Sequence, residues 1–186
     1  MAFLLALSGP IAVGKSAVGQ ILLEKHHFLP IKSGDFLKNI LSERKQEVSR
    51  TALQELGDHL DRETDYLWLL KDVSLPAMQA GAPSQMWLLD AVRKKRQVEH
   101  FRERLGEEFF HVHFSAPEEV LARRYRQRQE SNQDYSGAVS YEDAVKHPNE
   151  RAARSLCEIA DLGIDLNIAT PDQAASLILQ KINQRC

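Results

Sequence analysis

The sequence has few cysteines and no apolar run long enough to cross a membrane. Cys157 and Cys186 are far apart and in no metal-like spacing, which gives no support for a disulfide framework or a zinc site and fits a reducing cytoplasm. The apolar stretch 1–7 is too short to span a bilayer, carries no basic segment and ends at Ser8-Gly9. We therefore expect a cytoplasmic protein with no membrane partner, in which this stretch is a buried strand.

Excess charge of either sign is also lacking. The formal net charge of the 186 residues is −2 at pH 7, although 27% of them are charged and 43% are hydrophobic. A nearly neutral chain has no overall attraction to nucleic acid or to an anionic membrane, so any basic site must be local. The length suits a single domain over residues 1–186 that is large enough to bury a core.

Strand and helix signals alternate along the chain. Short apolar runs predict strands, and segments with apolar residues at helical spacing predict helices between them. The expected strands are 3–7, 28–31, 86–89, 109–114 and 166–169. The expected helices are 15–25, 36–47, 51–60, 64–80, 93–105, 118–128, 150–160 and 172–182. This alternation predicts an α/β fold in which a five-stranded parallel sheet has helices on both faces.

A phosphate-binding loop follows the first expected strand. The stretch Gly9-Pro10-Ile11-Ala12-Val13-Gly14-Lys15-Ser16 fits the Walker A pattern without a mismatch, with a strand signal before it and a helix signal after it. Glycines let the backbone fold closely around an anion, and the N–H groups of the loop point at the phosphates. Lys15 would neutralise the β and γ oxygens, and the Ser16 hydroxyl would bind Mg²⁺. The residues expected to bind ATP are Gly9, Pro10, Ile11, Ala12, Val13, Gly14, Lys15, Ser16 and Ala17.

The loop predicts the three-layer P-loop NTPase fold, but it does not by itself separate kinases from other P-loop proteins. GTPases carry an Asn-Lys-x-Asp or Thr-Lys-x-Asp segment, and neither occurs in the sequence. The chain is also small for most motor ATPases, which have further domains. A small kinase fits best, and it needs a second, basic site for its phosphoryl acceptor.

Candidate acceptor-binding residues lie in a helical region at about 34–80. Arg50 and Gln54 are four residues apart, so they would share one face of a helix. An arginine fork can grip a phosphate, and a glutamine amide can read the edge of a base. The alternative is a solvated helix face.

Asp35 follows the second expected strand, and two interpretations of it stay open. In kinases that act on hydroxyl groups, a carboxylate here can accept the proton of the substrate. A monophosphate acceptor is already ionised and needs no base, so Asp35 would then contact only sugar or metal-bound water. The alternative is that Asp35 caps a helix that begins at Phe36.

Asp90 ends the expected strand 86–89 at the carboxyl edge of the sheet, where ligands bind in open α/β sheets. Its carboxylate could hold Mg²⁺ through water, or it could cap the next helix. We expect Arg93 to face the acceptor phosphate and the three basic residues after it to lie on a solvated face.

A basic helix precedes a polar segment at about 128–148 that is expected to be a lid. Its four arginines are Arg123, Arg124, Arg126 and Arg128. Arg124 and Arg128 share one helical face and are expected to reach the transferring phosphoryl group as catalytic residues, with Arg123 behind them. The alternative is a charged surface helix.

Four segments together resemble the deoxynucleoside monophosphate kinases of the phage and bacterial P-loop group. They are the phosphate loop; Phe36-Leu37-Lys38 with Ser49-Arg50-Thr51-Ala52-Leu53-Gln54-Glu55-Leu56-Gly57, Arg62 and Trp68; Trp87-Leu88-Leu89-Asp90-Ala91-Val92-Arg93; and Ala160-Asp161-Leu162-Gly163-Ile164-Asp165-Leu166-Asn167 with Asp172 and Leu177. The resemblance covers most of the chain in order. It implies a lid like that of nucleotide kinases and a monophosphate site lined by Arg50, Gln54, Arg62 and Trp68. The residues expected to bind the acceptor are Asp35, Lys38, Arg50, Gln54, Arg62 and Arg93. The chain departs from the family at Asp58, where threonine is usual, and in the basic residues after Asp90.

These residues lead to three hypotheses about function. The first is phosphoryl transfer from Mg²⁺-bound ATP to a nucleoside or deoxynucleoside monophosphate, giving the diphosphate and ADP, with Lys15 and the lid arginines as catalytic groups. The second is a kinase for another small acceptor, a nucleoside or a coenzyme precursor, with Asp35 as the base. The third is a nucleotide-binding regulatory ATPase. We expect a small-molecule acceptor and no nucleic-acid partner, and a homodimer stays open.

Overall fold

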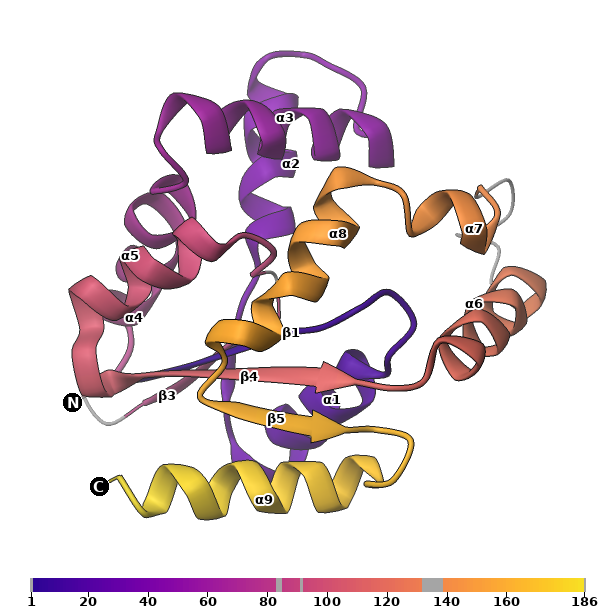
Figure 1. Cartoon of the computed structure of the whole chain (residues 1–186). Coiled ribbons are helices and arrows are strands. Elements are labelled where there is room, and N and C mark those ends of the chain that lie inside the picture. Colours follow the sequence, from indigo (N-terminus) through magenta and orange to yellow (C-terminus); the bar gives the residue numbers. More distant parts are fainter. Residues whose placement is uncertain (1, 83–84, 91, 132–138, 186) are drawn as a thin grey trace.

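A computed structural model describes residues 2–82, 85–90, 92–131 and 139–185, and it arranges them as a sheet between two layers of helices (Figure 1). The strands are β1 (Phe3–Ser8), β2 (Leu29–Ile31), β3 (Met86–Leu89), β4 (Phe109–Ser115) and β5 (Leu162–Asp165). They pair in the order β2-β3-β1-β4-β5, and every pair is parallel. The predicted five-stranded parallel sheet is therefore confirmed.

Helices occupy the connections between the strands. The α-helices are α1 (Lys15–His26), α2 (Ser33–Glu43), α3 (Arg50–Glu63), α4 (Leu75–Ala80), α5 (Lys95–Leu105), α6 (Glu118–Ser131), α7 (Tyr141–Ala144), α8 (Pro148–Ser155) and α9 (Pro171–Asn183). A π-helical segment, Leu69–Ser74, leads into α4, and 3₁₀ turns lie at Gly106–Glu108 and Leu156–Ile159.

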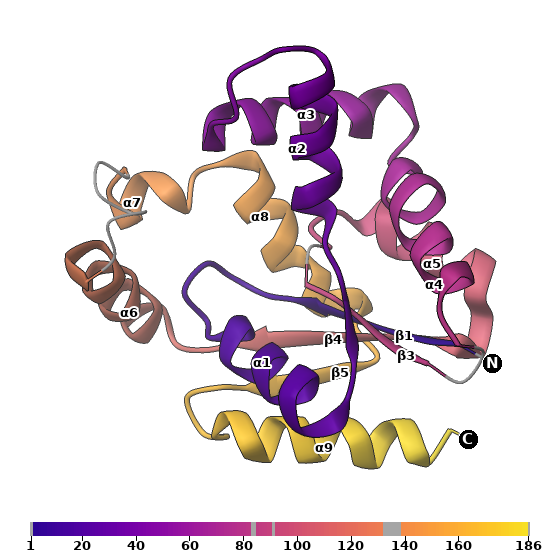
Figure 2. The ribbon, with the colours of Figure 1, turned by 180° about the vertical axis from the view of Figure 1, so that it is seen from behind.

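The two faces of the sheet bury separate cores. Because successive side chains of a strand point to opposite faces, Leu5 and Leu7 of β1 pack with α1, α6 and α9, whereas Leu4 and Ala6 pack with α2, α3, α4 and α5. Figure 2 shows α1 lying with α9 across the sheet from α4 and α5. The central strand β1 is therefore covered on both sides, which holds its carboxyl end and the loop after it in a fixed place.

The last strand lies four residues earlier than predicted. The sequence predicted a strand at 166–169, but β5 is Leu162–Asp165, paired with β4 from Val112 to Ser115. The Asp165 side chain accepts a hydrogen bond from the N–H of Asn167 at 2.7 Å, which turns the chain away from the sheet. The apolar residues that suggested a strand are then part of a turn, and Ile168 is 81% exposed.

The helix predicted at 64–80 is interrupted. Asp65 and Tyr66 have positive φ angles of 49° and 64°, so α3 ends before them and a new segment begins. Pro76 has no N–H to donate to the preceding turn and its ring would crowd that turn, and the residues just before α4 are wound as a π-helix. Such π-helical segments are rare and occur mostly as single turns inside α-helices.

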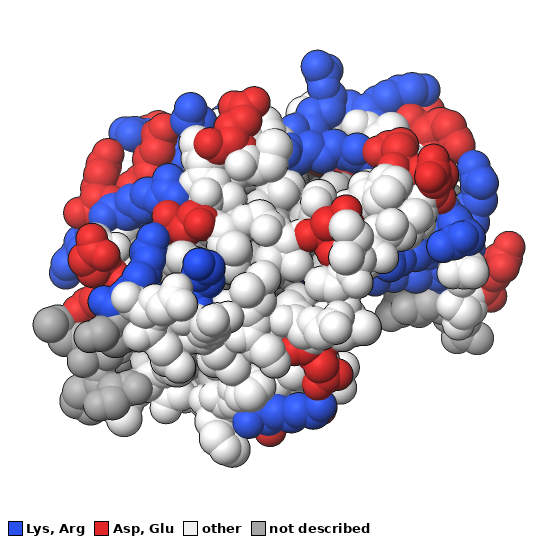
Figure 3. Space-filling view, turned by 60° about the horizontal axis from the view of Figure 1, so that its bottom comes forward, with Lys and Arg blue, Asp and Glu red and all other residues white. Residues whose placement is uncertain are grey.

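The predicted lid at 128–148 lies only partly within the described residues, since 132–138 fall outside them. The described part includes the end of α6, all of α7, the residues on either side of α7 and the first residue of α8. On the face in Figure 3, basic and acidic side chains both lie around a largely uncharged middle. No helix among the described residues combines the length and the apolar character that crossing a membrane requires.

Candidate functional site

The phosphate loop lies between β1 and α1, and two of its glycines are required by geometry. Gly9 has φ +140°, and a Cβ atom built on it would be 2.5 Å from the carbonyl oxygen of Phe114. Gly14 has φ +111° and directly precedes α1. Residues other than glycine rarely adopt either of these φ angles. The loop therefore packs closely against β4 while it turns into the N-terminus of α1.

Lys15 lies over the loop that it follows. Its Nζ donates to the carbonyl oxygen of Gly9 at 3.0 Å and approaches that of Pro10 at 3.5 Å. Burial lowers the pKa of the Lys15 ammonium, because removal from water disfavours its charged form. The side chains of Ser16 and Ala17 at the start of α1 are exposed to solvent.

Four charged side chains from different parts of the chain lie close enough to shift the pKa of Lys15. The carboxylates of Asp90 and Glu150 raise its pKa against the effect of burial, and Arg93 and Arg128 lower it. Asp90, Arg93 and Arg128 were all predicted site residues. Their effects on the pKa of Lys15 place them near this side chain. Glu150 was not predicted.

Asp90 follows β3, which is hydrogen-bonded to β1. The Asp90 side chain is exposed to water, and partial desolvation by the protein around it raises the pKa of its carboxyl group. Lys15 and Arg93 act in the opposite direction. The alternative role as a helix cap is wrong, because α5 begins at Lys95 and its N-cap residue is Lys94.

Two arginines of α6 are half-buried and lie toward the loop. Arg124 donates to the carbonyl oxygen of Val13 at 2.8 Å and to that of Leu166 at 3.0 Å. Arg128 lies close enough to act on Lys15. By contrast, Arg123 and Arg126 are exposed, and Arg126 pairs with Glu142 of α7 at 3.1 Å. A catalytic role for Arg124 and Arg128 stays a prediction.

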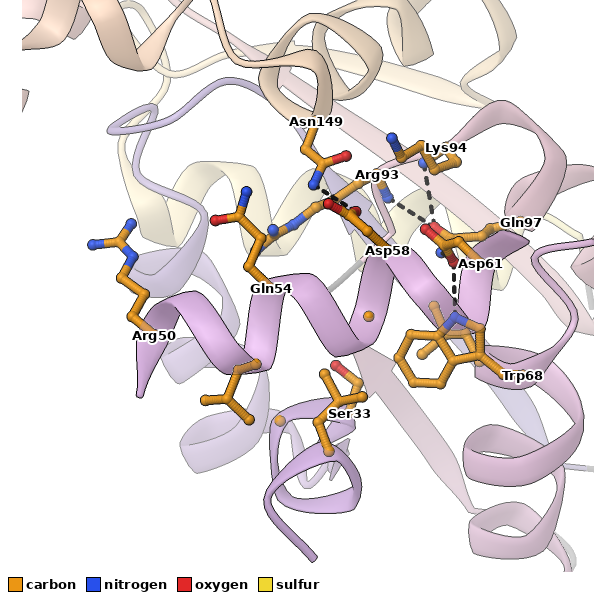
Figure 4. Close-up of a pocket in the computed structure, with 15 residues that line it drawn as sticks. Ser33, Arg50, Gln54, Asp58, Asp61, Trp68, Arg93, Lys94, Gln97 and Asn149 are labelled. Atoms are coloured by element: carbon orange, nitrogen blue, oxygen red, sulfur yellow. Dashed lines mark hydrogen bonds between the residues drawn. The ribbon is translucent and has the colours of Figure 1, made fainter. Parts of the chain in front are cut away.

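A cavity of about 270 Å³ lies between α3, the start of α2, the segment before α5 and the start of α8 (Figure 4). Three of the predicted acceptor residues line it, namely Arg50, Gln54 and Arg93. Apolar side chains line it too, among them Leu37 and Leu53. The cavity thus combines cations with apolar surface, as small-molecule sites commonly do.

Asp61, which lines the cavity, has a buried carboxylate. One oxygen of Asp61 accepts hydrogen bonds from Trp68 Nε1 at 2.7 Å and from Gln97 Nε2 at 3.1 Å. Burial raises the pKa of Asp61, and these two hydrogen bonds oppose the shift. The side-chain oxygen of Gln97 in turn accepts from the backbone N–H groups of Arg93 and Lys94, at 3.1 and 3.2 Å. This network therefore fixes the backbone that carries Arg93.

Helix α3 is bridged to the start of α8 across the cavity. Asn149 Nδ2 donates to Asp58 Oδ1 at 2.9 Å, and the side chains of Gln54 and His147 meet at 2.6 Å. Figure 4 shows Asp58 and Asn149 directed toward each other from the two helices. The wall of the cavity is thus closed by polar side chains about 90 residues apart in sequence.

Helix α8 also contacts the phosphate loop. Glu150 Oε1 accepts a hydrogen bond from the backbone N–H of Ile11 at 2.9 Å and from Arg154 Nε at 3.0 Å. Arg154 donates further to Glu118 at 2.8 Å and to the Tyr141 hydroxyl at 3.1 Å. A chain of hydrogen bonds therefore links α6 and α7 to the loop.

Three predicted residues do not line the cavity. Asp35 and Lys38 are exposed and pair with each other at 3.3 Å. The proposed cap role of Asp35 is wrong, because α2 begins at Ser33 and places Asp35 in its first turn, where a negative charge is favourable. Arg62 is exposed near the end of α3.

Four site residues were not predicted from the sequence: Asp58, Asp61, Asn149 and Glu150. The first two could have been found, since they continue the spacing of three to four residues that Arg50 and Gln54 begin on α3. Asn149 and Glu150 gave no such signal, because their partners lie 91 and 139 residues away.

The fold and the loop define a P-loop protein with a kinase-like α/β fold. Residues 5–144 match the model of the AAA_18 family, described as an AAA domain. This match covers most of the chain, so the chain belongs to that family. No curated protein matches it by sequence.

Solved structures share the fold at low sequence identity. Shikimate kinase from Aquifex aeolicus is 13% identical with a TM-score of 0.57, and the match covers 97% of this chain and 96% of that one. An uncharacterized protein from Eubacterium ventriosum has the same identity and TM-score, with 97% and 98% covered. The YorR protein from Bacillus subtilis, solved in complex with phosphorylated GDP, is 18% identical with a TM-score of 0.50, and 97% and 95% are covered. These likenesses establish the fold alone.

Proposed function

We propose that the protein transfers a phosphoryl group from ATP to a nucleoside or deoxynucleoside monophosphate. The observation that carries this proposal is the position of Arg93. Its guanidinium lies close enough to act on Lys15 and Asp90, and the same residue lines the cavity. A cation shared between the phosphate loop and the cavity suits a reaction in which an acceptor phosphate meets the γ-phosphate of ATP.

The donor side would be held by the loop. Its N–H groups and Lys15 would bind the β and γ phosphates of ATP, and Ser16 with Asp90 would hold a Mg²⁺ ion. The chemical fit is good, because Mg²⁺ prefers oxygen ligands. The Asp90 carboxyl group can supply such oxygens, and it lies close enough to Lys15 for that side chain to affect its pKa. When bound, the ion would neutralise charge on the phosphates. Arg124 and Arg128 would add positive charge from the α6 side.

The acceptor side would be held by the cavity. Arg93 would bind the acceptor phosphate, and Arg50 and Gln54 would contact the rest of the nucleotide. Such an acceptor needs no base, which agrees with the exposed position of Asp35 outside the cavity wall. The alternative, a hydroxyl acceptor with Asp35 as base, would require that side chain to leave Lys38 and turn toward the cavity.

The test is ADP release from Mg²⁺ and ATP in the presence of a panel of nucleoside and deoxynucleoside monophosphates. We expect at least one acceptor to raise the rate well above the rate without acceptor. Arg93→Ala should lower kcat/KM by about 100-fold or more, because it removes charge where the two phosphates meet. Arg104→Ala, an exposed arginine late in α5, is the matched control and should match the wild type. The proposal fails if no member of the panel raises ADP release.

A further inference from the structure

The wall of the cavity presents hydrogen-bond acceptors where Asp58 meets Asn149. Asp58 Oδ1 is taken by the Asn149 amide nitrogen at 2.9 Å. That contact fixes the orientation of both groups, because the amide must present its nitrogen to the carboxylate. Within the described part of the chain, the other oxygen of Asp58 and the amide oxygen of Asn149 have no hydrogen-bond partner.

Both of these oxygens belong to side chains that a ligand in the cavity would meet. Asp58 and Asn149 line the cavity, and Asn149 is only 8% exposed. A ligand in the cavity would take these oxygens out of water, so a ligand that donates hydrogen bonds to them is favoured over one that does not. A third acceptor, the carboxylate of Asp61, lies one helical turn further along α3.

Arg93 brings positive charge to the same cavity, and it lies close enough to Lys15 to affect the pKa of that side chain. Under the proposed function Arg93 holds the acceptor phosphate, which leaves the oxygens of Asp58 and Asn149 to meet the base. Leu37 and Leu53 offer apolar surface to a flat ring. The base edge that fits must therefore donate hydrogen bonds and must not present lone pairs to a carboxylate.

We propose that Asp58 and Asn149 select guanine among the acceptor bases. Guanine carries two neighbouring donors on one edge, the N1–H and the N2 amino group, which match two neighbouring acceptor oxygens. Thymine has a single N–H between two carbonyl groups, and cytosine and adenine place a ring-nitrogen lone pair beside their amino group. Each of these would bring an acceptor against the Asp58 carboxylate. This inference rests on the proposed phosphoryl transfer to a nucleoside monophosphate.

The test measures kcat/KM of the full-length protein with ATP and the monophosphates of guanosine, inosine, thymidine, cytidine and adenosine, including the deoxy forms. We expect guanine to exceed thymine, cytosine and adenine by at least about 10-fold. Inosine monophosphate keeps the N1–H and lacks the N2 amino group, so its value should lie between those of guanine and of the other bases.

Asp58→Asn is the decisive variant. The side-chain oxygen of the new asparagine can still accept a hydrogen bond from Asn149, so the bridge between α3 and α8 stays. Its NH₂ group, however, replaces the second carboxylate oxygen and donates hydrogen bonds instead of accepting them. We expect guanine activity to fall by about 10-fold or more while thymine activity is retained or rises. Glu55→Gln makes the same carboxyl-to-amide change on α3 at a residue that lines a different groove, and it should keep the wild-type preference.

The outcomes distinguish a wrong base assignment from a wrong proposed function. If the wild type favours thymine, cytosine or adenine, the base assignment is wrong while phosphoryl transfer to nucleotides stands. If Asp58→Asn lowers activity equally for all bases, Asp58 only supports the structure and the assignment is again wrong. If no monophosphate raises ADP release, the proposed function itself fails, and the base assignment fails with it.

Discussion

Gly9 is the residue whose conformation the phosphate loop depends on most directly. Its φ of +140° and the 2.5 Å distance from a built Cβ atom to the Phe114 carbonyl oxygen leave no room for a side chain. We predict that Gly9→Ala destabilises the protein by about 2 kcal/mol or more, because strain and a backbone clash add. Thermal unfolding should show this as a fall in Tm of at least about 4 °C.

Gly163→Ala provides the comparison for that measurement. Gly163 lies in β5, and a Cβ atom added there meets nothing within 4 Å. Its Tm should stay close to that of the wild type. Equal losses in the two variants would show that glycine replacement as such, rather than the close approach to Phe114, causes the effect.

At the residue scale, the sequence predicted those site residues whose neighbours are close in the chain. The phosphate loop is a contiguous stretch, so its pattern could be read directly, and Asp90 could be placed because it ends a recognisable strand. Asn149 and Glu150 contact Asp58 and Ile11 only after the chain has folded. No local pattern contains information about such contacts, which is why they were missed.

Helix α8 is the element that connects the phosphate loop with the rest of the site. Glu150, in the first turn of α8, accepts a hydrogen bond from the backbone N–H of Ile11 at 2.9 Å and another from the Arg154 side chain. We predict that Glu150→Ala raises the Kd for ATP by about 10-fold, because loss of a hydrogen bond to a charged group leaves the loop less ordered. Titration calorimetry with Mg²⁺ and ATP measures this directly.

Glu158→Ala removes an exposed carboxylate from the 3₁₀ turn after α8 and should bind ATP like the wild type. The connecting role of α8 would be refuted if Glu150→Ala lowered Tm but left the Kd for ATP unchanged. That result would mean that Glu150 contributes to stability without shaping the loop.

At the element scale, the alternation of apolar periods predicted nearly all strands and helices, and the errors have local causes. The last strand was placed at 166–169 because these residues are apolar, although the Asp165 side chain turns the chain there. The helix expected at 64–80 was too long because the positive φ angles of Asp65 and Tyr66 cannot be read from apolar spacing.

The whole molecule contains a buried polar cluster beneath the phosphate loop that makes stability depend on pH. The Ser8 hydroxyl lies 2.7 Å from His111 Nε2 and 2.9 Å from His113 Nδ1, and all three side chains are buried. Burial lowers the pKa of each histidine to about 4, with Arg102 adding to the shift at His111 and Lys15 adding to it at His113. Both imidazoles are therefore neutral in the folded protein at neutral pH.

The sign of the pH effect follows from the unfolded chain, in which histidine titrates near 6.5. Above this pH both states are neutral and the full stability is present. Between about pH 6.5 and pH 4 the unfolded chain binds protons that the folded protein does not, so the free energy of unfolding falls. The two histidines together should remove roughly 4–6 kcal/mol over this range.

Urea unfolding at intervals between pH 7.5 and pH 4.5 tests this prediction through its slope. His113→Asn and His111→Gln keep a hydrogen-bonding atom near Ser8 but cannot titrate. Each should therefore reduce the slope with which the free energy of unfolding decreases toward low pH, even if it lowers that free energy at every pH. His27→Gln, at an exposed position after α1, should leave the slope of the wild type. An unchanged slope in both core variants would mean that carboxylates elsewhere, and not this cluster, cause the loss of stability in acid. A flattened slope would show that the packing that fixes β1 and β4 beneath the phosphate loop depends on keeping these two imidazoles uncharged.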